Sequence, residues 1–181
     1  LLVTCALLAI AGLYLLSSAS GLLMIFVFAT LYGFGKTFFW PTTLGVVSEQ
    51  CPKGGALTLN AIAGIGMLAV GILGGPVIGK MAEDAVKQSV IAETNEETYG
   101  KISKDSTYFL GDYTAVELAK VDSLEGDEKD TVKHSIQVGK QASLASVAIF
   151  PVFMLICYLA LIFYFKGRGG YKPVELEEGK S

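Results

Sequence analysis

Four long apolar runs constrain this chain more than any other feature of its sequence. They cover residues 1–19, 21–47, 56–78 and 144–165. A helix needs about 20 apolar residues to cross a hydrocarbon core roughly 30 Å thick, and a backbone in lipid must satisfy its own hydrogen bonds. Barrel strands would alternate apolar and polar residues, and these runs do not. We therefore predict an all-α membrane protein with four transmembrane helices.

The composition agrees with a membrane location and excludes several classes of function. Hydrophobic residues make up 52% of the 181 residues, charged residues only 17%, and the mean hydropathy is +0.53. The net charge of −3 offers no basic excess for phosphates, which excludes nucleic-acid binding. The three cysteines, Cys5, Cys51 and Cys157, match neither a disulfide framework nor a zinc site. We expect no metal, no cofactor and no catalytic residues.

A polar insert separates the first three apolar runs, within residues 1–82, from the fourth. It covers residues 83–143, and its stretch 83–140 holds 13 acidic residues against 7 lysines. The spacing of Val, Leu and Ile predicts short helices over 115–124 and 131–144, the second continuous with the fourth run. A partly disordered acidic loop is the alternative. His134, within the insert, is interpreted as a solvated residue rather than a ligand.

The positive charges that flank the runs predict an orientation. Lys53 lies between the second and third runs, and Lys166, Arg168 and Lys172 lie in the tail 166–181. Two spans separate these places, so both lie on the same side of the membrane. The positive-inside rule identifies that side as the cytoplasm. The insert is then extracytoplasmic, with Lys80 as a counter-signal. We expect an integral protein of the plasma or inner membrane with a cytoplasmic C-terminus.

Lys36 is the residue that most strongly indicates a function. It falls near the middle of the second run, where a lysine costs about 2.5 to 3.5 kcal/mol on insertion scales. It should therefore face a protein interior or a water-filled cavity. Tyr32, Trp40 and Thr43 share its helical face and complete the predicted solute-lining stripe. Asn60 in the third run is a second polar candidate.

Two physical roles suit Lys36, and a structural one competes with them. It can attract an anionic or hydroxyl-rich solute, or pair with a carboxylate and exchange partners during transport. A static ion pair is the alternative. No Asp or Glu lies inside any of the four runs, so a buried counter-charge must come from the solute or from outside this chain.

Glycines and prolines mark the second and third runs as irregular. Pro41 removes a helical hydrogen bond to the carbonyl of Thr37, and Gly33 and Gly35 weaken the preceding turns, which predicts a kink or hinge. In the third run Gly71, Gly75 and Gly79 recur every four residues, with Pro76 among them. Small residues on one face let another helix approach closely, so we interpret this face as a packing surface.

Residues 33–84 resemble the tenth and eleventh helices of a major facilitator superfamily transporter. The matching features are Gly33, Gly35 and Pro41, the loop with Glu49 and Pro52, and a Gly-x-x-x-Gly-Pro-x-x-Gly pattern over residues 71–79. The fuller antiporter-type pattern has a glycine where this chain has Ile62, so exchange and symport both stay open. The insert before the last helix is longer than usual for that family.

This resemblance implies that the chain is the C-terminal third of a twelve-helix secondary active transporter. Its partners would be the lipid bilayer, the remaining transmembrane helices and a small polar solute: a sugar, a nucleoside or an organic anion. The apolar start without an initiator Met also leads us to expect a longer protein. A non-transporting four-helix scaffold of tetraspanin-like layout is the alternative, although the insert lacks that family's cysteines. An intramembrane enzyme is disfavoured because the runs lack acid-base pairs.

Overall fold

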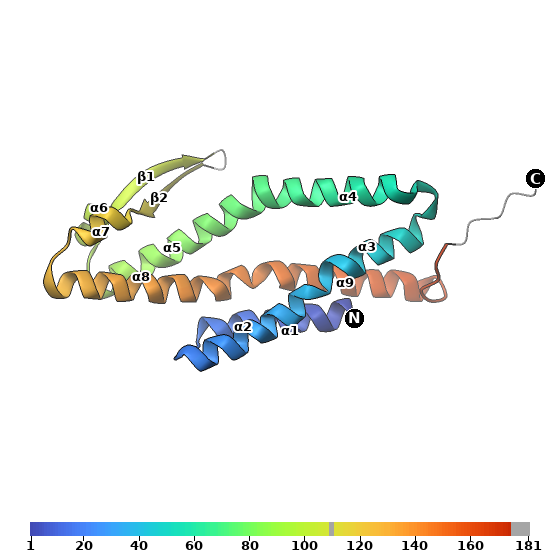
Figure 1. Cartoon of the computed structure of the whole chain (residues 1–181), viewed down its shortest axis with the longest axis horizontal. Coiled ribbons are helices and arrows are strands. Elements are labelled where there is room, and N and C mark those ends of the chain that lie inside the picture. Colours follow the sequence, from blue (N-terminus) through green and yellow to red (C-terminus); the bar gives the residue numbers. More distant parts are fainter. Residues whose placement is uncertain (109–110, 175–181) are drawn as a thin grey trace, which may run out of the picture.

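The computed structural model describes residues 1–108 and 111–174 and shows a mostly helical, elongated molecule (Figure 1). Three of its helices have the length and composition to cross a membrane: Leu22–Gln50, Pro52–Glu93 and Gly126–Gly167. The two longest have 42 residues each, or about 63 Å at 1.5 Å per residue, roughly twice the thickness of the hydrocarbon core. Each therefore has length for both a membrane span and an extramembrane extension.

The first apolar run forms a helix shorter than expected. Helix α1 (Leu2–Ser17) has 16 residues, below the length of about 20 that a perpendicular span requires. The structure thus supports three of the four predicted spans by length and composition. A short turn with Gly21 at φ 90° connects α1 to α2, where the left-handed backbone favours glycine.

The second apolar run is divided into two helices. Helix α2 (Leu22–Thr37) and helix α3 (Phe39–Gln50) are separated by a single residue, Phe38, with φ −89° and ψ −6°. The division lies three residues before Pro41, which lacks the N–H that would pair with the Thr37 carbonyl. The sequence predicted an irregularity from Pro41, and the structure places the break at Phe38.

The third apolar run continues well into the segment interpreted as the insert. After a 3₁₀ turn (η1, Pro52–Gly54), α4 (Gly55–Ala69), a π-helical turn (η2, Val70–Gly74) and α5 (Gly75–Glu93) form one rod. The expected helix ended at residue 78, because the apolar character ends there. The backbone stays helical because α5 becomes amphipathic and buries Val86 and Val90.

The remainder of the insert forms a small extramembrane subdomain (Figure 1). It contains α6 (Glu96–Ile102), an antiparallel hairpin of β1 (Ser103–Tyr108) and β2 (Gly111–Val116), and α7 (Leu118–Asp122). The all-α prediction missed the hairpin, and the expected helix over 115–124 is wrong at its start. The predicted helix 131–144 lies within α8 (Gly126–Val147), which continues into α9 (Ile149–Gly167).

The subdomain has its own hydrophobic core, where α5 packs against α8. The core residues are Val86, Val90, Tyr99, Ile102, Val121, Val132 and Ile136. At the crossing a Cβ on Gly139 would lie 2.6 Å from the Val86 Cα, so only glycine allows this approach. The described part of the insert is therefore an ordered fold rather than a disordered acidic loop.

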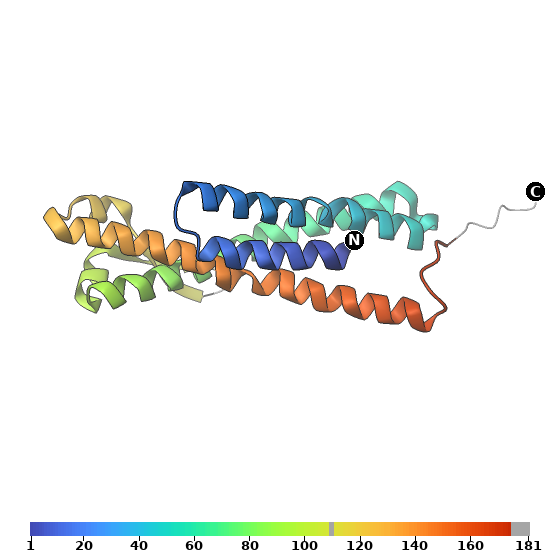
Figure 2. The same ribbon diagram turned by 90° about the horizontal axis from the view of Figure 1, so that it is seen from below.

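The short helix α1 is held on several sides (Figure 2). A Cβ on Gly35 of α2 would lie 2.6 Å from the backbone nitrogen of Ala9, and one on Gly12 of α1 would lie 2.8 Å from the Tyr32 Cα. The Gln141 side-chain amide of α8 donates to the carbonyls of Leu16 (3.1 Å) and Ala19 (2.5 Å). These bonds provide a donor partner for carbonyl groups at and just beyond the C-terminal end of α1, where helical hydrogen bonding ends.

Two glycines of α2 provide a matched test of this packing. We expect Gly35→Ala to destabilise the protein by about 1 to 3 kcal/mol, because the new methyl group overlaps the α1 backbone. Gly33→Ala should leave stability unchanged or slightly raised, since a Cβ at Gly33 has nothing within 4 Å and alanine favours helix. Thermal unfolding of the purified full-length protein in detergent measures both. Equal melting temperatures for the two variants would contradict the close α1–α2 contact.

Candidate functional site

The predicted solute-lining stripe crosses the break between α2 and α3. Tyr32 and Lys36 lie on α2, whereas Trp40 and Thr43 lie on α3. Tyr32 is half-buried and Lys36 is exposed. Among the ion pairs of the described residues, none includes Lys36. The Lys36 side chain is therefore exposed and has no ion-pair partner among the described residues.

The two α3 members of the stripe also have structural contacts. The Trp40 ring lies beside Gly66 of α4, where a Cβ would come within 3.2 Å of the indole. Trp40 remains 45% exposed, so part of its ring is free for another partner. The Thr43 hydroxyl donates to the Phe39 carbonyl at 2.7 Å within α3. Trp40 thus joins α3 to α4, while Thr43 satisfies its hydroxyl locally.

Asn60 and the regularly spaced glycines lie on the rod formed by α4, η2 and α5. Asn60 is exposed on α4. A Cβ at Gly71 or Gly79 would have nothing within 4 Å, and one at Gly75 would meet only the Val70 carbonyl oxygen, 3.8 Å away. The predicted packing face is therefore uncovered by the described residues of this chain.

The rod is irregular just where the glycines and Pro76 gather. The π-helical turn Val70–Gly74 immediately precedes Gly75 and Pro76. Pro76 cannot donate to the carbonyl of Ile72, so the regular α-helical pattern is interrupted at this point. Single π-turns inside helices commonly occur at functional sites. With the breaks at Phe38 and at Ala148, which separates α8 from α9, all three long helices contain an interruption within their apolar parts.

A second polar site, missed by the sequence analysis, lies at the opposite end of the molecule from the subdomain. The Tyr171 hydroxyl donates to the Glu49 carboxylate, and the Val174 N–H donates to the Glu49 carbonyl at 2.8 Å. The Gln50 amide donates to the Lys172 carbonyl at 3.0 Å. The segment after α9, residues 168–174, therefore docks on the C-terminal end of α3, at the same end of the molecule as Lys53. We call this segment the docked tail. These partners are 122 residues apart, so no local pattern could reveal them.

The polar groups of the subdomain form structural pairs. Lys133 bonds to Asp122 at 2.9 Å and holds the pKa of that carboxyl below its usual value. The Ser135 hydroxyl donates to Glu93 at 2.7 Å. Exposed His134 lies 3.5 Å from the same carboxylate. These contacts link α8 to α7 and to the end of α5.

The structure offers no cluster of metal ligands among the described residues, where no three His, Cys, Asp or Glu side chains converge. The three cysteines are free: Cys5 is buried, and Cys51 and Cys157 are exposed.

No protein-family model, curated protein or solved structure matches the chain. The candidate functional features are therefore Lys36 with its stripe, the helix interruptions and the docked tail.

The docked tail should respond to high pH. The hydrogen bond to Glu49 raises the pKa of Tyr171, so docking is fully stabilised below the unfolded pKa of about 10 and weakens as pH rises through the higher folded value. A spin label at Lys172→Cys should be ordered at pH 8 and mobile above that folded pKa. Tyr171→Phe should make it mobile at pH 8 as well.

Tyr164→Phe is the matched control for this experiment, because Tyr164 lies on α9 and stacks with Arg168 instead of contacting Glu49. It should leave the label ordered at pH 8. A label that stays equally ordered in Tyr171→Phe would show that the phenol does not hold the tail.

Proposed function

We propose that this chain is the C-terminal part of a secondary active transporter of the major facilitator type, which moves a small polar solute by alternating access. The observation that carries the proposal is Lys36. It is the central residue of the 29-residue helix Leu22–Gln50, and it is exposed within this chain. A charge at that depth costs several kcal/mol unless protein, water or solute surrounds it. Further helices and a solute would provide those surroundings.

The side chains around Lys36 suit a solute with hydroxyl or carboxylate groups. An ammonium group attracts carboxylates and donates hydrogen bonds to hydroxyl oxygens, while Tyr32 and the exposed part of Trp40 offer aromatic surface. Sugars, nucleosides and organic anions all fit this description. Asn60 on α4 could extend the same polar surface.

The helix interruptions support a transport mechanism that requires conformational change. Transporters commonly place discontinuous helices beside their substrate sites, since unwound backbone can bind solute and absorb changes in dihedral angles. Here the break at Phe38 lies two residues from Lys36, and the π-turn Val70–Gly74 interrupts the neighbouring rod. A static four-helix scaffold would need neither feature.

The proposed orientation places the docked tail in the cytoplasm and the subdomain outside. Lys53, Lys166 and Arg168 lie at the end where the tail meets α3, and short basic segments are retained in the cytoplasm. The protein would then be an integral protein of the plasma or inner membrane.

Lys36→Ala tests the proposed transport role. We expect it to lower uptake by about 10- to 100-fold, which corresponds to the roughly 1.5 to 3 kcal/mol of a hydrogen bond to a charged group. Insertion should be unaffected, because the variant removes a costly membrane charge. The measurement screens sugars, nucleosides and organic anions for uptake into vesicles that contain the full-length protein, normalised to folded protein by size-exclusion profile.

Lys53→Ala is the matched control, since it removes the same charge from an exposed turn outside the apolar runs. It should transport like the wild type. Undiminished uptake by Lys36→Ala would refute the solute-binding role, and loss of folded protein together with uptake would indicate a static ion pair. A wild-type protein that transports none of these solutes would favour the scaffold alternative.

Single-cysteine variants test the orientation. In a background without Cys5, Cys51 and Cys157, an impermeant thiol reagent should label Asp105→Cys in intact cells and Lys172→Cys only after permeabilisation. Position 105 is exposed on β1, and position 172 lies in the docked tail. The reverse pattern would place the subdomain in the cytoplasm.

A further inference from the structure

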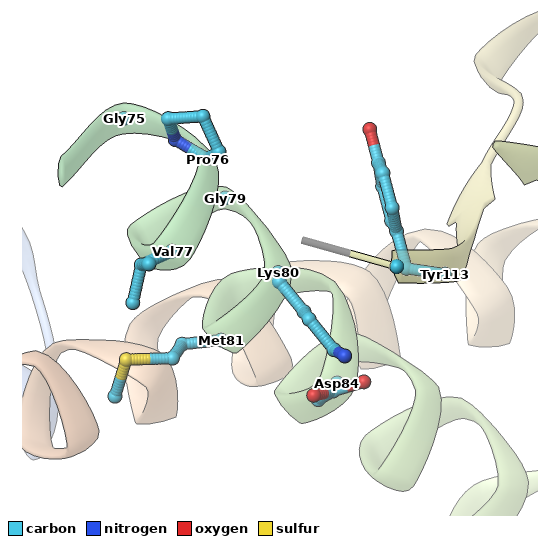
Figure 3. A pocket seen from close by; sticks show the side chains of 9 residues that line it. Gly75, Pro76, Val77, Gly79, Lys80, Met81, Asp84 and Tyr113 are labelled. Atoms are coloured by element: carbon cyan, nitrogen blue, oxygen red, sulfur yellow. The ribbon is translucent and has the colours of Figure 1, made fainter. Parts of the chain in front are cut away.

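A pocket of about 580 Å³ lies between α5 and the β-hairpin (Figure 3). One wall is the first part of α5, with Pro76, Val77 and Met81 as its apolar side chains. The opposite wall is β2, from which Tyr113 stands across from α5 (Figure 3). Gly75 and Gly79 also line it, and the space above them is open because they have no side chains.

The pocket lies where the rod passes from apolar to polar sequence. No charged residue occurs between Lys53 and Lys80, whereas Glu83 and Asp84 follow directly. A lysine at such a boundary extends its ammonium group toward the headgroup layer while its methylene groups stay in apolar surroundings. In a bilayer spanned by this helix, the apolar wall of the pocket would lie at the edge of the hydrocarbon core and its charged part at the headgroups.

Two opposite charges lie one helical turn apart in this pocket. Lys80 and Asp84 are both exposed, and Lys80 extends along α5 toward Asp84 (Figure 3). Neither belongs to an ion pair among the described residues. Both charged groups are therefore open to a ligand that has a negative and a positive group at a similar spacing.

The strand that contributes Tyr113 is fixed to α5 by a specific hydrogen bond. The Val116 N–H donates to the Glu83 carboxylate at 3.1 Å, and the Tyr99 hydroxyl donates to the Thr114 carbonyl at 3.3 Å. These bonds hold β2 beside the residues that carry the two charges. The Tyr113 ring thereby lines the β2 side of the pocket, with its hydroxyl pointing away from Lys80 and Asp84 (Figure 3).

We propose that this pocket binds a zwitterionic phospholipid with a primary ammonium headgroup, of the phosphoethanolamine class. Lys80 would donate to the lipid phosphate, and Asp84 would accept from the lipid ammonium group. An acyl chain would follow the open surface over Gly75 and Gly79. The occupant is a lipid rather than a soluble compound, because only an acyl chain covers the apolar wall at the end of the membrane span.

Charge complementarity selects this headgroup over other lipids. The phosphate and ammonium of the lipid match the lysine and carboxylate of the protein, and the complex is neutral overall. An anionic glycerol headgroup would leave Asp84 without a partner beside a negative lipid. A quaternary ammonium headgroup would have no N–H to donate to Asp84. This site does not depend on transport, so the two proposals can fail separately.

Native mass spectrometry of the purified full-length protein tests the assignment. It compares phosphatidylethanolamine, phosphatidylglycerol and phosphatidylcholine with identical acyl chains. We expect the wild type to prefer the ethanolamine lipid by about two- to fivefold, the range of one exposed charge interaction. Asp84→Asn should abolish this preference, whereas Lys80→Gln should weaken binding of all three lipids. Lys104→Gln and Asp105→Asn, exposed on β1, are the matched controls and should bind like the wild type.

Three results would overturn the proposal. The first is equal binding of the three lipids by the wild type, which needs no variant and is insensitive to folding defects. The second is an unchanged ethanolamine preference in Asp84→Asn. The third is displacement of the lipid by free phosphoethanolamine at equal concentration, which would assign the pocket to a soluble headgroup compound instead.

Discussion

The close contact between α5 and α8 is the interaction on which the rest of the structure depends. It forms where Gly139 lets α8 approach the backbone of α5 at Val86, and it contributes most residues of the extramembrane core. Both helices continue directly into apolar segments, α5 backward into α4 and α8 forward into α9. The subdomain is therefore connected to the apolar part by two long helices rather than by flexible linkers. Gln141 of α8 also donates to carbonyls at the C-terminal end of α1, so the same helix that packs in the subdomain contacts the apolar part.

The apolar helices could be predicted from the sequence, whereas the subdomain could not. Long apolar stretches leave the backbone few solutions, because lipid offers no hydrogen-bond partners. That constraint ends at Lys80, and beyond it tertiary packing decides the structure. The segment of β1 has the sequence Ser-Lys-Asp-Ser-Thr-Tyr, which lacks a clear alternation of apolar residues. It becomes a strand because it pairs with β2, whose Val116 is held by Glu83. A contact across 33 residues leaves no local signal.

Within the candidate site too, the sequence did not reveal which elements come into contact. The four-residue spacing of Gly71, Gly75 and Gly79 indicated a packing surface, but spacing cannot say which helix packs there. Gly33 and Gly35 are two residues apart on one helix, yet only Gly35 contacts α1. The difference depends on the direction from which α1 approaches. Lys36 could be proposed as a candidate from the sequence, because the cost of a charge inside a membrane depends only on that residue and its depth in the apolar run.

The π-turn η2 separates α4 from α5, and these two parts of the rod contact different elements. Residues beyond Gly75 belong to α5, and its later turns are fixed to α8 by the core around Val86 and Val90. Residues before Val70 belong to α4, which contacts α3 through Trp40 and Gly66. We expect any bending of the rod to occur at Val70–Gly74, because that segment lacks regular α-helical hydrogen bonds and borders Pro76. The lipid pocket begins at Gly75, directly beyond this turn. A change in α4 at its contact with Trp40 would therefore reach the subdomain through the turn that the pocket adjoins.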